Sequence, residues 1–84
     1  MNIISSKPIA LLSNNLQSGI EYIKHLFSIA HVNIQRKTVI TNTNITLIVC
    51  SNKNDFISYE FSGLMLTPDY DGDLIPLAQS RIRF

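Results

Sequence analysis

Three aspartates alternate in the stretch Asp69-Tyr70-Asp71-Gly72-Asp73, and this spacing is the first in the chain that suggests metal chemistry. Oxygen ligands at every second position are how a calcium loop begins. In a calcium loop the glycine follows the third ligand and a bidentate glutamate occupies position twelve. Here Gly72 precedes the third aspartate, and position twelve is Ser80. We therefore expect a solvated acidic loop and no cofactor, and leave open whether two of its carboxylates take up a cation.

The same loop has the composition of a protein contact. Three clustered carboxylates can engage a surface that is rich in arginine or lysine. Aromatic side chains such as that of Tyr70 contribute much of the free energy of protein interfaces. We therefore predict that Asp69, Tyr70, Asp71 and Asp73 bind a partner protein.

A second short motif follows the most apolar stretch of the chain. Asn52-Lys53-Asn54-Asp55 matches Asn-Lys-x-Asp, and it resembles the guanine-reading motif of small GTPases, which implies a pocket for a guanine base. The chain contains no G-x-x-x-x-G-K-[ST] sequence that would hold the phosphates. The Asp-x-x-Gly of residues 69–72 follows this motif, in reverse of the usual order, and the chain is too short for such a fold. We interpret the four residues as a polar turn and assign no family.

Five basic residues define an alternative face for nucleic acid. They are Arg36 and Lys37, which are adjacent, Lys53 in the polar turn, and Arg81 and Arg83 near the end of the sequence. The formal net charge of +1 provides little long-range attraction for a phosphate backbone. Nucleic-acid binding is therefore the second hypothesis and not the first.

Cysteine and histidine do not point to catalysis. Cys50 is the only cysteine, so no internal disulfide can form, and its place in an apolar run predicts a buried, inert thiol. His25 and His31 are six residues apart, which puts them on different faces of a helix and prevents them from holding one metal. No Ser/His/Asp arrangement follows from the spacing. We predict no enzyme activity and no metal site of this type.

Composition predicts one small domain, residues 1–84, with an unusually lightly charged surface. Hydrophobic residues make up 45% of the chain and charged residues 15%. A surface with few charges repels other molecules only weakly, and this favours an oligomer or a bound partner. The chain shows neither a secretory signal nor an apolar run long enough to span a membrane. Together with the single cysteine, this predicts a reducing, cytoplasmic setting.

Two apolar patterns predict the core of the fold. The run Ile45–Cys50 is interpreted as the central strand, because only a strand that is covered on both faces tolerates such continuous apolarity. The segment Leu16–Ala30 is predicted to be the main helix and to cover one face, since its apolar residues form a single stripe. We expect the terminal segments or a partner molecule to cover the other face.

The remaining strands are predicted from residues that alternate between apolar and polar. Residues Val32–Ile40 and Asp55–Phe61 alternate in this way, and with the central strand they would form an antiparallel meander. Residues 64–66 would extend the third strand beyond a bulge, and Ala78–Phe84 would form a terminal strand. The segment Ile9–Leu12 fits a buried strand or a first helical turn. The predicted fold is α+β, with one main helix on an antiparallel sheet of three to five strands.

These observations lead to three hypotheses about function. The first is a non-catalytic module that binds a partner protein, of the kind found among small inhibitors, immunity proteins and anti-defence proteins of phages and mobile elements. This is an analogy between classes of protein. Its acidic loop would occupy a basic nucleic-acid channel by charge mimicry. The alternatives are a small nucleic-acid-binding regulator and a structural subunit of a homo-oligomer.

Overall fold

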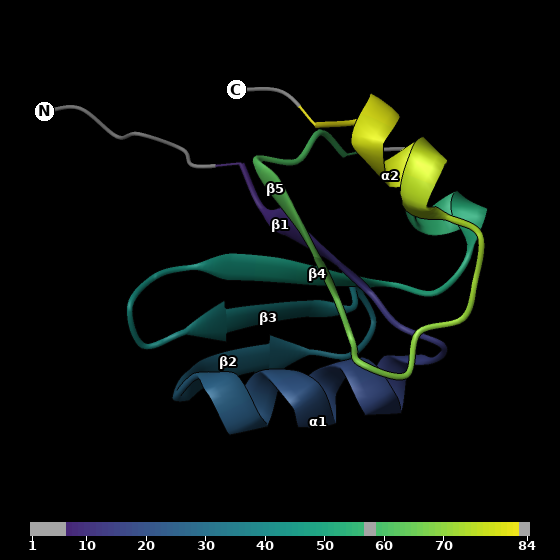
Figure 1. Ribbon diagram of the computed structural model, residues 1–84. Helices are drawn as coiled ribbons and strands as arrows, with labels where there is room; N and C mark the ends of the chain where they lie inside the picture. Colours follow the sequence, from purple (N-terminus) through teal and green to yellow (C-terminus); the bar gives the residue numbers. More distant parts are fainter. Residues whose placement is uncertain (1–6, 57–58, 83–84) are drawn as a thin grey trace, which may run out of the picture.

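A five-stranded sheet forms the centre of the computed structural model, which describes residues 7–56 and 59–82 (Figure 1). Its strands lie in the order β2-β3-β4-β1-β5, so β4 is the middle strand, as predicted for Ile45–Cys50. In chain order the elements are β1 (Ile9–Leu12), α1 (Leu16–Leu26), β2 (Ile29–Asn33), β3 (Thr38–Thr41), β4 (Thr46–Cys50), the 3-10 helix η1 (Lys53–Phe56), β5 (Gly63–Leu66) and α2 (Ile75–Ser80).

The sheet is mixed, so the prediction of an antiparallel sheet is only partly right. Strand β1 pairs in parallel with β4 on one side and with β5 on the other. The pairs β2–β3 and β3–β4 are antiparallel. The segment Ile9–Leu12 is therefore a strand, and it is buried because it has a neighbour on each side and a packed layer on each face. Parallel neighbours need a long crossover connection, and between β1 and β4 it consists of α1 and the β2–β3 hairpin.

The predicted strand Val32–Ile40 is instead the hairpin of β2 and β3. The side chain of Asn33 starts the turn, since its Oδ1 accepts a hydrogen bond from the backbone N–H of Arg36 at 3.1 Å. Lys37 completes the turn in the left-handed region, with a φ of 54°. The preceding helix ends at Leu26 and not at Ala30, which belongs to β2.

The prediction of a third meander strand over Asp55–Phe61 is also wrong for the residues that the structure describes. Residues Lys53–Phe56 form η1, and Ile57 and Ser58 lie outside the described residues. Residues 64–66 belong to β5, which lies beyond β1 and does not extend a strand next to β4.

A second helix replaces the predicted terminal strand Ala78–Phe84. Helix α2 begins after Leu74 and has Pro76 in its first turn, where a missing N–H group costs no hydrogen bond. Ala78 of this helix is fully buried, and Phe61 and Ile82 form an isolated parallel bridge after it. Arg83 and Phe84 lie outside the described residues.

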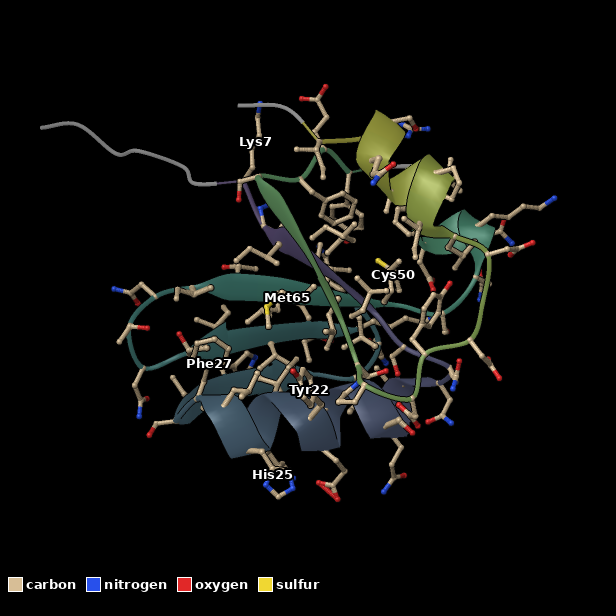
Figure 2. The ribbon with its side chains drawn as sticks, viewed as in Figure 1. Lys7, Tyr22, His25, Phe27, Cys50 and Met65 are labelled. Atoms are coloured by element: carbon tan, nitrogen blue, oxygen red, sulfur yellow. The ribbon has the colours of Figure 1, made fainter. Side chains whose placement is uncertain are left out.

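Each face of the sheet has its own apolar layer, and both are supplied by this chain. Leu47 and Val49 of β4 pack with α1, whereas Ile48 and Cys50 pack with Phe56, Phe61 and α2. Figure 1 shows α1 along one side of the sheet and α2 with η1 on the other. In Figure 2, Phe27 and Met65 lie on the α1 side and His25 points away from the sheet. The C-terminal segment therefore covers the second face of β4.

Gly19 lets α1 approach β4 closely. A Cβ atom at this position would lie 2.5 Å from Cγ1 of Val49 and 3.2 Å from Cβ of Ser13. Val49 is fully buried and branched at Cβ, so it has little freedom to move aside. The glycine that weakens the helix in isolation is therefore required for its contact with the sheet.

Candidate functional site

The carboxyl ends of the three parallel strands meet at one edge of the sheet. The ladder continues to their ends, since the N–H of Ser13 donates to the carbonyl of Cys50 at 3.1 Å and the N–H of Thr67 donates to that of Leu12 at 3.0 Å. The connection after β1 leaves toward the α1 face, and the connection after β4 leaves toward the face covered by η1. Ligands of open α/β sheets bind in the crevice outside such strand ends.

A cavity of about 320 Å³ opens at this edge. Its lining comes from the loops after all three parallel strands. The polar groups come from Asn14 after β1, from Ser51, Asn52 and Lys53 after β4, and from Tyr70 and Asp73 after β5. Because the cavity is lined by hydroxyl, amide, ammonium and carboxylate groups, it is suited to a small polar ligand.

The side chain of Asn14 fixes the acidic loop, residues 67–73, to the end of β1. Its Nδ2 donates a hydrogen bond to the carbonyl of Asp69 at 2.9 Å, and its Oδ1 accepts one from the N–H of Asp71 at 3.2 Å. Both functional groups of the amide are therefore used. This contact joins residues that lie far apart in the sequence, and it gives the loop a defined position.

Tyr70 anchors the same loop from within. Its half-buried ring packs against the apolar layer under α2, and its hydroxyl accepts a hydrogen bond from the N–H of Leu74 at 3.0 Å. A Cβ atom at residue 72 would lie 2.5 Å from this hydroxyl, so Gly72 is needed for the close approach. The ring of Tyr70 thus holds the loop in place, whereas the side chains of Asp69, Asp71 and Asp73 are exposed.

The three predicted aspartates divide into two sets. Asp73 lines the cavity, whereas Asp69 and Asp71 do not. Within residues 7–56 and 59–82, no group of three or more histidine, cysteine, aspartate or glutamate side chains is placed to hold a metal ion.

Of the five predicted basic residues, the four that the structure describes do not form one face. Lys53 lines the cavity at the carboxyl edge, and Lys37 forms an ion pair with Asp55. Arg81 lies at the opposite edge, because its carbonyl accepts a hydrogen bond from the N–H of Phe61, close to the amino ends of β1 and β5. Arg36 is exposed in the β2–β3 turn. Arg83 is outside the described residues.

Asp55 has a structural role in the turn after β4. Its Oδ2 accepts hydrogen bonds from the N–H groups of Ser51 and Asn52, and its Oδ1 lies 2.7 Å from Nζ of Lys37. Burial alone would raise the pKa of this carboxyl, but these hydrogen bonds and the ammonium group lower it below its usual 3.8. The carboxylate that would read a guanine base in the resembling motif is therefore occupied within the turn.

Cys50 is an inert thiol in the layer under α2 (Figure 2). It is fully buried, and burial together with the nearby Asp55 carboxylate raises its pKa to about 12. The thiolate form is the nucleophile, so this cysteine is unreactive at neutral pH in the folded protein.

Sequence reasoning missed the contribution of Asn14, Ser51 and Asn52 to this site. A signal was present, because each lies within two residues of the end of a buried apolar strand. The missing information was that β1 and β4 are parallel neighbours, and only their pairing brings the two polar turns together.

Comparisons with protein families, with curated proteins and with solved structures find no match to this chain. In the part of the chain that the structure describes, no helix has the length and apolarity needed to cross a membrane.

Proposed function

We propose that this chain is a non-catalytic module that binds a partner protein through the exposed carboxylates of its acidic loop. The proposal depends on one observation, the exposure of the unpaired carboxylates of Asp69 and Asp71. Their carboxylates are exposed and make no ion pair or hydrogen bond with any other described residue. The fold therefore positions two negative charges that interact with no other described residue.

The fixed position of the loop supports binding and not merely solubility. Asn14 and Tyr70 hold the loop from two sides. A loop that is ordered before binding loses less conformational entropy when it meets a partner. Opposite charges on that partner, such as the arginines and lysines of a nucleic-acid channel, would complement it. This is the chemistry expected of a small inhibitor or anti-defence protein that acts by charge mimicry.

The proposal is tested by fluorescence anisotropy with a labelled oligoarginine peptide. We expect saturable binding that weakens as salt rises, although the net charge of +1 opposes it. The double variant D69N/D71N should weaken binding by about tenfold, since each of the two lost charge pairs contributes about 0.7 kcal/mol.

The matched control is E21Q/E60Q, which removes the same charge from other surfaces. Both glutamates belong to exposed ion pairs, Glu21 with Lys24 and Glu60 with Lys7, so their loss should leave the fold intact. Equal weakening by the two double variants would mean that only net charge matters, and the proposal would fail.

The same assay tests the nucleic-acid alternative. A labelled single-stranded oligonucleotide should bind at low salt if Arg36, Lys37, Lys53, Arg81 and Arg83 act together. The ion pair of Lys37 with Asp55 and the distant position of Arg81 argue against this. Light scattering on the same sample tests the third alternative, a homo-oligomer.

A further inference from the structure

We infer that the cavity at the carboxyl edge of the sheet binds a small hydroxylated phosphate monoester, of the size of a ribose phosphate unit. This inference does not rest on the proposed function, because Asp69 and Asp71 take no part in the cavity. It rests on which polar groups of the lining are occupied and which are free.

The walls of the cavity are fixed by internal hydrogen bonds. Asn14 is occupied by the acidic loop, and Ser13 bonds with the backbone of Asn15 through its hydroxyl. The hydroxyl of Tyr70 accepts the N–H of Leu74. These side chains form the frame of the cavity, and the O–H of Tyr70 remains available to donate to a ligand.

Four other side-chain groups of the lining also remain free for a ligand. Among residues 7–56 and 59–82, the ammonium of Lys53 and the carboxylate of Asp73 make no ion pair or hydrogen bond. The hydroxyl of Ser51 likewise has no partner there, and Asn52 uses its Oδ1 to accept the N–H of Asn54 and leaves its Nδ2 free. The ligand must therefore accept from a cation, a hydroxyl and an amide, and must donate to a carboxylate.

The anionic end of the ligand is expected at Lys53. The N–H groups of Ser51 and Asn52 already hold the carboxylate of Asp55, so they cannot hold a second anion. At the start of α1, the side chain of Asn15 caps the N–H of Ser18. This leaves the Lys53 ammonium, with the side chains of Ser51 and Asn52, as the phosphate-binding group.

The opposite end of the ligand is expected at Asp73. A carboxylate repels a bare anion but accepts hydrogen bonds from sugar hydroxyls, as an acidic residue does for ribose in dinucleotide-binding folds. One cation and one carboxylate in the same cavity therefore select a molecule with a single phosphate and several hydroxyls. The volume of about 320 Å³ suits one such unit and is too small for a dinucleotide.

The test is to titrate the ¹⁵N-labelled chain with ribose 5-phosphate, ribose and inorganic phosphate in turn. Binding is measured by the chemical shifts of the backbone amides. Ribose 5-phosphate should produce saturable shifts at the amides of residues 51–53 and 72–73. Ribose and phosphate alone should each bind at least about tenfold more weakly, a difference of about 1.4 kcal/mol. Absence of saturable shifts at these amides, or phosphate binding as tight as that of ribose 5-phosphate, would overturn the inference.

Two substitutions and their matched controls separate the ends of the site. K53Q should weaken the binding of ribose 5-phosphate about tenfold, while K24Q, on the outer face of α1, should leave it unchanged. D73N should weaken the binding of ribose 5-phosphate but leave the binding of inorganic phosphate unchanged or make it tighter. D71N should change neither affinity. All four side chains are exposed, and the unperturbed amides of the same spectra report whether each variant is folded. Weakening of phosphate alone by D73N would contradict the assignment of Asp73.

Discussion

Nζ of Lys37 lies 2.7 Å from Oδ1 of Asp55, and this ion pair joins the β2–β3 turn to the turn after β4. The carboxylate is largely shielded, with 11% of its side chain exposed, and it also accepts the N–H groups of Ser51 and Asn52. It is therefore the centre of a small network that holds Ser51 and Asn52, two residues that line the cavity.

Loss of this carboxylate should destabilise the fold. D55N removes the charge from three hydrogen bonds, and we expect the free energy of unfolding to fall by about 1–3 kcal/mol in urea titrations. The exposed pair of Glu21 and Lys24, 3.9 Å apart, supplies the comparison. E21Q should cost less than about 0.5 kcal/mol. Equal losses for the two variants would show that the shielding of Asp55 has no energetic consequence.

The contribution of Asp55 should depend on pH with a definite sign. Its pKa is lowered from 3.8 on folding, so the folded state favours the charged form. The stability that it supplies is then fully present above the unfolded pKa and is lost as the pH falls through the folded pKa. Urea titrations of the wild type and D55N should differ most at neutral pH and converge below pH 3.8. A difference that grows toward acid pH would contradict the lowered pKa.

Alanine at Gly19 should destabilise the chain even though it favours a helix. The added Cβ would lie 2.5 Å from Val49 Cγ1, and overpacking of this kind costs about 1–3 kcal/mol against a gain of up to about 1 kcal/mol in helix propensity. Thermal unfolding of G19A should show a lower Tm. G63A is the control, because its Cβ would meet only Ile9 Cγ1, at 3.9 Å. In a V49A background the cost of G19A should be smaller, because the contact with Cβ of Ser13 at 3.2 Å remains.

Removal of the Asn14 side chain should loosen the acidic loop without unfolding the sheet. N14A deletes both contacts with residues 69 and 71, so the amide of Asp71 should lose its protection from hydrogen exchange. Amides of β1 and β4 should keep theirs. Unchanged exchange at Asp71 would mean that packing of Tyr70 alone orders the loop.

Cys50 should report on unfolding through its reactivity. Because the thiol is buried and its pKa is about 12, native protein should react with a disulfide reagent only through opening of the structure. The rate should rise by orders of magnitude in denaturant. Rapid reaction of the native chain would contradict the burial of β4.

The features that sequence patterns predicted are those with a local cause. A continuous apolar run identified β4, and a single apolar stripe identified α1, because burial imposes both patterns on neighbouring residues. The direction of β1 has no such signature, since the burial of Ile9–Leu12 is the same beside parallel or antiparallel partners. Apolar alternation over Ala78–Phe84 suggested a strand, whereas the helix-start signal of Pro76, which was not used, coincides with the start of α2.

The candidate site was predictable only in part for the same reason. The composition of residues 69–73 marked the acidic loop, but its attachment to Asn14 depends on the pairing of β1 with β5. Likewise, nothing near Lys37 in the sequence indicates that its charge is neutralised by Asp55.

The position of β1 between β4 and β5 also determines the order in which the chain can assemble. As the polypeptide is synthesised, Ile9–Leu12 has no sheet partner until Thr46–Cys50 has emerged, and its second side stays unpaired until Gly63–Leu66 follows. Helix α1 and the β2–β3 hairpin can form earlier, but they have no central strand pair to pack on. Such long-range pairing slows folding and leaves apolar strands exposed to aggregation until the last strand arrives. The chain is therefore expected to fold in one late step. A chain that is truncated before β5 should not complete the fold.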